Sequence, residues 1–217
     1  MNIEKNLDRI LKEIPQNVTL VAVTKHRSIE EIQRVVDYGI KDLGENRVQE
    51  LLDKYDKIKG DIRWHLIGHL QTNKVKYIID KVDLIHSVDS VKLAKEINTQ
   101  AKKHELIMRI LIQVNVSMED SKFGIAVEEV ESFLQKISHE SNISVAGFMT
   151  MAPFTENIEE TRHIFRKMRE IYDKIKDNQD AFKNVNIETL SMGMTNDCPV
   201  AIEEGSNLVR IGRGIFV

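Results

Sequence analysis

Short apolar runs alternate with longer amphipathic segments along this chain, and the alternation continues almost to the last residue. Runs such as residues 20–23 and 110–112 contain no polar residue, which is typical of parallel strands that are covered on both faces. We predict strands at residues 20–25, 42–46, 63–68, 84–89, 109–116, 144–151, 188–193 and 208–216.

The segments between these runs carry apolar residues at helical spacing. Between Ile158 and Ile175 they recur every three or four positions with charged residues between them, which predicts an amphipathic helix. Ser28, followed three positions later by Glu31, fits a capping box at the start of another helix. Residues 2–13 predict an extra helix before the first strand, and Pro15 prevents that helix from continuing.

Eight strands that alternate strictly with helices favour a closed barrel over an open, doubly wound sheet. An open dinucleotide-binding sheet would carry G-x-G-x-x-G after its first strand, where this chain has Thr24, Lys25, His26 and Arg27. We therefore predict an α/β fold with one domain over residues 1–217. It is a single (β/α)8 TIM-type barrel with an extra N-terminal helix.

Composition limits the partners and the cellular location that we expect for this fold. The 217 residues are 41% hydrophobic and 30% charged, with 31 basic and 34 acidic residues interspersed and a net charge of −3. No basic stripe indicates a nucleic-acid partner, and no apolar run is long enough to cross a membrane. The first thirteen residues lack the apolar core of a signal peptide, and the single cysteine excludes an internal disulfide. We expect a cytoplasmic monomer.

Lys25 is the first candidate for chemistry, because it ends an apolar strand and active sites of barrels lie at the C-terminal ends of the strands. A free lysine has a pKa of about 10.4, so little of it is the neutral nucleophile at pH 7. Desolvation at the barrel mouth would favour the neutral amine and its attack on a carbonyl. The alternative is a lysine on the rim with its amine in water.

The last predicted strand contains glycines at positions 212 and 214, between and after two arginines. Such glycines let backbone N–H groups approach a phosphate, and barrels often bind phosphate after strands seven and eight. Hydroxyls of Ser191 and Thr195, after the seventh strand, would complete the phosphate site. The alternative is that these glycines only form a turn that closes the barrel.

Two other features predict no site. His65 and His69 have the spacing of two metal ligands on a helix, but their segment is a predicted strand without the glutamate of H-E-x-x-H. We therefore expect no metal. Cys198 lies between Asp197 and Pro199 and is interpreted as an incidental thiol rather than a nucleophile.

A series of short motifs lies at or near the ends of the predicted strands. They are residues 21–25 (VAVTK), 44–50 (GENRVQE), 64–74 (WHLIGHLQTNK), the set Asn115, Glu119, Lys122 and Gly124, and residues 147–151 (GFMTM), 191–194 (SMGM) and 210–212 (RIG). With them nearly the whole chain resembles the YggS/PROSC family of pyridoxal 5′-phosphate (PLP)-binding proteins, also called PLP homeostasis proteins. That family resembles the N-terminal barrel of alanine racemase without its second domain. Two positions depart from the family pattern, with Thr195 in place of the usual serine and Phe148 in place of the common leucine.

The resemblance implies roles for individual residues. Lys25 would hold PLP as a Schiff base, Arg210 would face the pyridine nitrogen, and Asn46 would lie beside the ring. The residues implied for the phosphate are Gly212 and Arg213, through backbone N–H groups, and Thr195, through its hydroxyl.

The arginine assignment bears on activity. Arginine can only donate hydrogen bonds, so a pyridine nitrogen that faces it stays unprotonated and is a weaker electron sink. The tyrosine that racemases supply from their second domain is also missing. We therefore expect a carrier or reservoir in PLP homeostasis, with no catalytic residue and with PLP-dependent apoenzymes as recipients. The alternatives are an amino-acid racemase that uses His65, Tyr55 or Lys74 as acid or base, and a Schiff-base aldolase that acts on a phosphosugar.

Overall fold

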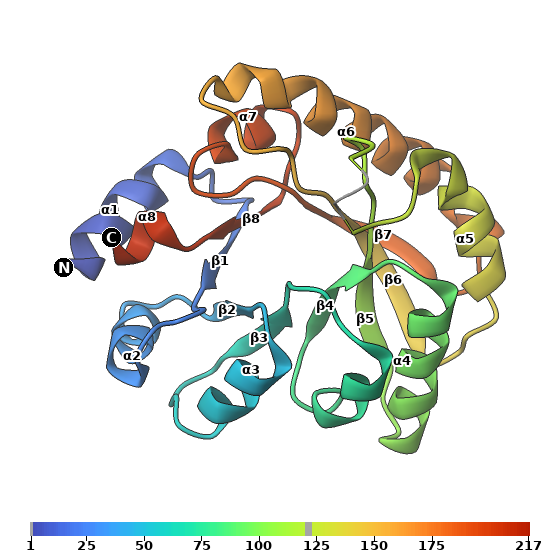
Figure 1. The fold of residues 1–217 in the computed structure, drawn as a ribbon, viewed down its shortest axis with the longest axis horizontal. Coiled ribbons are helices and arrows are strands. Elements are labelled where there is room, and N and C mark those ends of the chain that lie inside the picture. The colour runs from blue at the N-terminus through green and yellow to red at the C-terminus, as the bar shows by residue number, and fades with distance from the viewer. Residues whose placement is uncertain (1, 120–122) are drawn as a thin grey trace.

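A computed structural model describes residues 2–119 and 123–217, so Lys122 of the motif series lies outside the described residues. Within these ranges the strands are parallel, and each pairs with the next around a closed barrel in which β8 returns to β1 (Figure 1). The strands are β1 (Thr19–Val23), β2 (Asp42–Glu45), β3 (Arg63–Leu66), β4 (Leu84–Val88), β5 (Met108–Gln113), β6 (Ile143–Met149), β7 (Val185–Ser191) and β8 (Leu208–Ile211).

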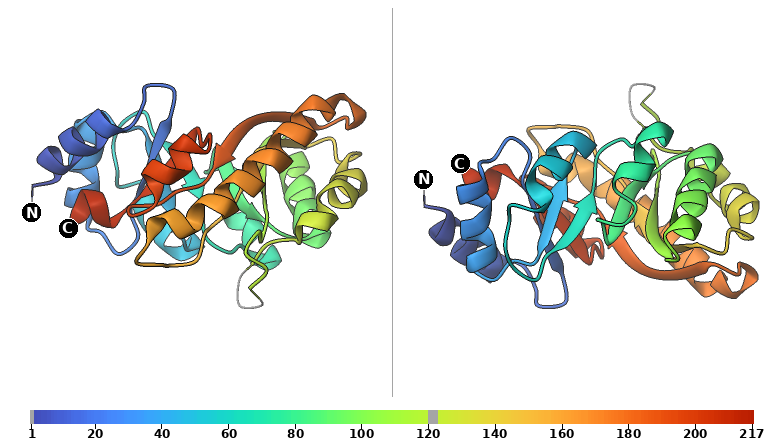
Figure 2. Two further views of the ribbon diagram at one scale, coloured as in Figure 1. Left: turned by 90° about the horizontal axis from the view of Figure 1, so that it is seen from above. Right: turned by 90° about the horizontal axis from the view of Figure 1, so that it is seen from below.

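Helices surround the barrel and cover the outer faces of the strands (Figures 1 and 2). The α-helices are α1 (Ile3–Glu13), α2 (Ile29–Asp37), α3 (Val48–Tyr55), α4 (Val91–Lys103), α5 (Val130–Ile137), α6 (Arg162–Asp177), α7 (Cys198–Glu203) and α8 (Arg213–Phe216). The 3₁₀ helices are η1 (Thr72–Tyr77), η2 (Val127–Glu129), η3 (Ile158–Thr161) and η4 (Gln179–Ala181). This arrangement confirms the predicted (β/α)8 barrel with an extra N-terminal helix.

The extra helix α1 lies beside α8, where the two ends of the chain meet (Figures 1 and 2). The side-chain amide of Asn6 donates to the carbonyls of Ile215 at 3.0 Å and Val217 at 3.2 Å. Because β8 also pairs with β1, the first and last segments together form the seam that closes the barrel.

Helix α2 begins as the sequence indicates. The Ser28 hydroxyl accepts the N–H of Glu31 at 3.2 Å, and the Glu31 carboxylate accepts the N–H of Ser28 at 2.9 Å. The predicted capping box is thus confirmed, and it fixes where the chain turns after β1.

The last predicted strand, residues 208–216, is wrong in its second half. β8 ends at Ile211, and residues 213–216 form α8, in which the N–H of Ile215 donates to the carbonyl of Gly212 at 2.9 Å. Only Ile215 and Phe216 of these four residues are apolar and buried, and two positions are too few to separate a strand period from a helix period, which explains the error. The strand ends at residues 23 and 45, and the start at residue 185, also differ from the prediction by one to three residues.

Side chains alternate along each strand, so one set points into the barrel and the other packs against the helices. The apolar part of the barrel interior is Val21, Leu84, Leu111, Ala146, Met149 and Leu208. A larger apolar layer between strands and helices makes up the rest of the core. Several other inward positions are polar, and they lead to the candidate site.

Candidate functional site

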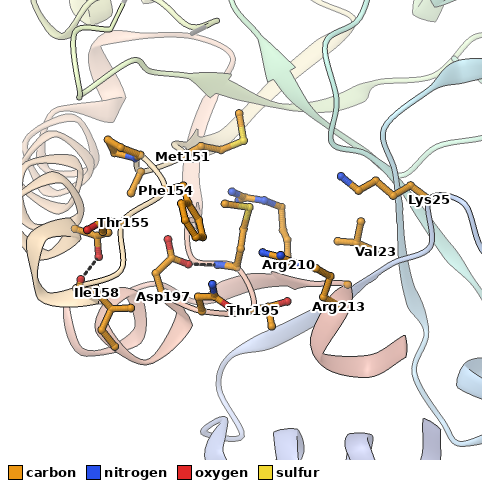
Figure 3. Close-up of a pocket in the computed structure, with 16 residues that line it drawn as sticks. Val23, Lys25, Met151, Phe154, Thr155, Ile158, Thr195, Asp197, Arg210 and Arg213 are labelled. Atoms are coloured by element: carbon orange, nitrogen blue, oxygen red, sulfur yellow. Dashed lines mark hydrogen bonds between the residues drawn. The ribbon is translucent and has the colours of Figure 1, made fainter. Parts of the chain in front are cut away.

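A cavity of about 430 Å³ opens at the C-terminal ends of β1, β7 and β8, beside the segment that follows β6. Five of the seven predicted cofactor residues line it together: Lys25, Thr195, Arg210, Gly212 and Arg213. Apolar side chains that include Val23, Met151 and Phe154 form further walls (Figure 3). Val23 and Met151 belong to two of the motifs described above, whereas Phe154 lies in a loop for which the sequence gave no signal.

Lys25 lies two residues beyond the end of β1 and extends toward the space in front of Arg210 (Figure 3). Its side chain is exposed, so burial does not desolvate the amine as the sequence analysis had supposed.

The backbone on either side of Lys25 is held by a buried ion pair. Lys54 Nζ lies 2.7 Å from Glu45 Oε1 and donates to the carbonyl of Thr24 at 2.8 Å. The Thr24 hydroxyl donates to the same carboxylate oxygen at 2.6 Å. On the other side, the N–H of His26, which has a φ of 60°, donates to a carboxylate at position 50. This cluster fixes the direction in which Lys25 leaves the barrel.

The loop after β7 folds over the start of α8 and forms the end of the cavity opposite Lys25. Thr195 Oγ1 accepts the N–H of Gly214 at 3.3 Å, and Asp197 Oδ1 accepts the N–H of Met194 at 2.6 Å. Gly193 has a φ of 91°, and a Cβ there would lie 2.6 Å from the Cβ of Ala201, so this turn requires glycine.

Arg210 forms the floor of the cavity and is buried. It donates through Nη1 to Ser191 Oγ and through Nη2 to the carbonyl of Thr150 at 3.0 Å. Burial lowers the pKa of Arg210 to about 10, while the nearby charge of Asp197 acts in the opposite direction. The guanidinium therefore stays protonated at neutral pH. Because the guanidinium has five N–H donors and no acceptor, a ligand atom that contacts it must accept a hydrogen bond.

These residues fit PLP. The amine of Lys25 is the partner that an aldehyde requires, and the donor-only guanidinium of Arg210 matches an unprotonated ring nitrogen. Gly212 and Arg213 begin α8, where the first N–H groups of a helix have no intrahelical carbonyl to bind. The apolar walls suit the faces of an aromatic ring.

The other two predicted cofactor residues do not line the cavity. Ser191 is fully buried at the end of β7, and its hydroxyl contacts Arg210 and His86 rather than the phosphate region. Asn46 is half-buried at the end of β2, and within the described ranges its buried Oδ1 has no hydrogen-bond partner. The backbone of Gly68 approaches Asn46 so closely that a Cβ would lie 2.2 Å from the Asn46 carbonyl oxygen.

Behind Arg210 the polar contacts continue through the barrel interior. Ser191 Oγ lies 3.0 Å from His86 Nδ1, and His86 Nε2 lies 2.9 Å from His65 Nδ1. His65 Nε2 in turn lies 3.0 Å from Asp42 Oδ1. We call the five side chains of Arg210, Ser191, His86, His65 and Asp42 the polar relay.

The relay ends at the closed end of the barrel. Arg63 binds the Asp42 carboxylate through Nε at 2.7 Å and Nη2 at 2.5 Å. Burial raises the pKa of Asp42, but hydrogen bonds from His65 and Arg63 outweigh that effect and lower it to about 2. The sequence analysis missed His86 and Asp42, although a histidine inside the apolar run of β4 was a visible signal.

The acid–base candidates of the racemase alternative lie elsewhere. His65 belongs to the relay, and the Tyr55 ring lies 5.8 Å from Lys81 Nζ. Lys74 lies over the ring of Tyr77. None of the three candidates is among the residues that line the cavity.

His69 and Cys198 take no part in the cavity either. His69 stacks on Phe123 at 4.0 Å and lies 3.5 Å from Asp89, so it is not paired with His65 as a metal ligand would be. Burial, with smaller contributions from Asp197 and Glu13, raises the pKa of the Cys198 thiol to about 11. A thiol that stays protonated is a poor nucleophile.

A search of the described ranges for a helix that is long and apolar enough to cross a membrane finds none.

Comparisons with known proteins were made over the whole chain. Residues 1–217 match the family model described as alanine racemase, N-terminal domain. The pyridoxal phosphate homeostasis protein of Aquifex aeolicus is 41% identical over 227 aligned residues, which cover 100% of this chain and 98% of that protein.

Solved structures agree with the sequence comparison. PipY of Synechococcus elongatus PCC7942, solved with PLP bound, has a TM-score of 0.90 at 28% identity, covering 99% of this chain and 100% of that chain. Alanine racemase of Clostridium difficile has a TM-score of 0.81 at 17% identity, covering 99% of this chain and 59% of the racemase chain. At that identity the racemase supports the fold alone.

Proposed function

We propose, from the premise that this chain belongs to the alanine racemase N-terminal domain family, and within it to the YggS/PROSC group of PLP homeostasis proteins, that it binds PLP as a Schiff base on Lys25. It acts as a carrier or reservoir of the cofactor in PLP homeostasis. The observation that carries the proposal is the cavity itself, in which an exposed lysine amine faces a buried, donor-only guanidinium.

The Lys25 amine would form the Schiff base with the aldehyde that PLP supplies, with loss of water. The side chains of the cavity have separate tasks in holding it. Arg210 donates to the ring nitrogen, while Thr195 and the backbone at Gly212 and Arg213 donate to the phosphate. The exposure of Lys25 suits a site that loads and releases its ligand.

The chain's own residues support binding better than turnover. A ring nitrogen that accepts from Arg210 is unprotonated, which weakens carbanion stabilisation. The candidates for a second acid or base, including His65 and Lys74, lie outside the cavity. We therefore propose a protein without strong catalytic activity that passes PLP to PLP-dependent apoenzymes.

A visible spectrum of the purified protein with added PLP tests the proposal. Wild type is expected to show the absorption band of a PLP Schiff base, and Lys25→Ala is expected to lose it. Lys74→Ala, which removes another exposed lysine, is the matched control and is expected to keep the band. A wild type that stays colourless after incubation with PLP would overturn the proposal.

A second experiment separates carrier from racemase. The PLP-loaded protein is incubated with individual amino acids in deuterated water, and exchange at Cα is followed by NMR. A carrier is expected to give no exchange beyond that of free PLP. Rapid exchange that disappears in Lys25→Ala would instead establish an enzyme.

A further inference from the structure

The polar relay crosses the interior of the barrel from its closed end to its mouth. All five side chains are buried, with exposed fractions of 7% for Asp42, 4% for His65, 0% for His86 and Ser191 and 4% for Arg210. Only Arg210 has a role in the proposed function. A buried polar group costs free energy unless it is hydrogen-bonded, so each contact of the relay should pair one donor with one acceptor. This condition determines which atom of each contact carries the hydrogen.

The two ends of the relay have fixed roles. Asp42 is ionised, since its pKa is about 2, and an ionised carboxylate can only accept, so the hydrogen between it and His65 is on His65 Nε2. Arg210 can only donate, so Ser191 Oγ accepts from it. The hydroxyl hydrogen of Ser191 is then available for His86 Nδ1.

The middle of the relay follows from these ends. Burial, together with the charge of Arg210, holds the pKa of His86 well below its usual value, so this ring is neutral and carries one hydrogen. If Ser191 donates to its Nδ1, that hydrogen is on Nε2 and donates to His65 Nδ1. The reverse order would make His65 a cation in the same core as Arg210 and would leave the Ser191 hydrogen without this acceptor.

We infer that His65, His86 and Ser191 are positioning residues, which form a one-way chain of hydrogen bonds from Arg210 to Asp42 and so hold the guanidinium in place and support its charge. Each donor points toward the carboxylate, so each dipole presents its negative end to Arg210. The relay thus connects a buried cation to a counter-charge at the far end of the barrel. The inference about the relay depends on its hydrogen bonds, and only the identity of the ligand that contacts Arg210 rests on the proposed function.

The first test deletes one hydroxyl from the relay and one beside it. Ser191→Ala removes the link between Arg210 and His86, whereas Ser206→Ala removes a buried hydroxyl that contacts only backbone carbonyls between β7 and β8. With 15N-labelled histidine and no added PLP, wild type is expected to show two slowly exchanging Nε2–H resonances. Ser191→Ala is expected to shift the resonance of His86 and Ser206→Ala to leave both in place.

The second test removes the distant charge. Asp42→Asn keeps an oxygen acceptor for His65 but removes the carboxylate, while Asp61→Asn removes a carboxylate that pairs with Lys41 at the same end of the barrel. Because the Coulomb energy of two charges falls only with the inverse of their separation, we expect Asp42→Asn to weaken PLP binding about threefold to tenfold and to shift the visible band, and Asp61→Asn to do neither.

The outcomes separate the two proposals. The relay is supported if both His65 and His86 are neutral with the hydrogen on Nε2, and if Asp42→Asn shifts the visible PLP band. A doubly protonated His65, or equal spectra for the Asp42 and Asp61 variants, overturns it. A wild type that never binds PLP overturns the proposed function, while the histidine resonances still test the order of hydrogens.

Discussion

The interior of this barrel has two unlike regions. One is an apolar cluster contributed mainly by β1, β5 and β6, with Leu84 and Leu208 at the N-terminal ends of β4 and β8. The other is the polar relay, contributed by β2, β3, β4, β7 and β8. The residues of both regions are buried. Apolar contacts have no donor or acceptor and so no direction, whereas the relay has a fixed order of donors and acceptors. The difference suggests that the apolar region supplies stability and the polar region supplies the site.

The largest expected effect is on stability, in the apolar cluster. Leu111→Ala should lower the free energy of unfolding by about 2–5 kcal/mol, because Leu111 is fully buried and its removal leaves a cavity. The affinity for PLP should remain that of wild type at temperatures where the variant is folded. Urea denaturation and a PLP titration measure the two quantities. A marked loss of PLP affinity in the folded variant would contradict the division of the interior.

The relay should respond differently to a change of similar size. His86→Leu leaves the Ser191 hydroxyl without its acceptor and His65 Nδ1 without its donor, which should cost about 1–3 kcal/mol. Here PLP binding should weaken as well, since the support of Arg210 is lost. If urea denaturation and PLP titration give an affinity equal to that of wild type, the relay does not position the site.

Of the two regions of the interior, only the relay should respond to acid. The pKa of Asp42 is lowered from 3.8 to about 2, so this carboxylate contributes stability above pH 4 that is lost as the pH falls toward 2. The contribution is about 1–2 kcal/mol after allowance for the partial exposure of its environment. Urea denaturation at pH 5 and pH 3 should show this component in wild type and Leu111→Ala. It should be missing in Asp42→Asn, and equal acid sensitivity of that variant would argue against the assignment.

The smallest effect should come from an apolar exchange of nearly equal volume. Met149→Leu, in the apolar cluster, should change the free energy of unfolding by no more than about 1.5 kcal/mol. The PLP band should be unchanged, because Met149 belongs to the apolar cluster and takes no part in the hydrogen bonds of the relay. A shifted band in this variant would show that the two regions of the interior are coupled through packing.

The strand-and-helix alternation was readable from the sequence because local periodicity determines it, and so was the position of Lys25 at a strand end. The error at residues 213–216 arose because this segment has only two buried apolar residues, too few to reveal a period. The relay was not readable, because its contacts join residues 21 and 105 positions apart, and only barrel closure brings them together. Ser191 illustrates this limit, since its sequence position suggested a phosphate contact and its neighbours in space gave it another partner.

The seam between β1 and β8 has a consequence for how the protein is made. Asn6 and Ile215, which are bonded across this seam, are separated by 209 positions in the chain. A growing polypeptide therefore exposes Lys25 long before Arg210 and Gly212 have been synthesised. In such a nascent chain the Lys25 amine can react with an aldehyde, but no cavity surrounds it. Selective capture of the ligand is thus reserved for chains whose barrel has closed.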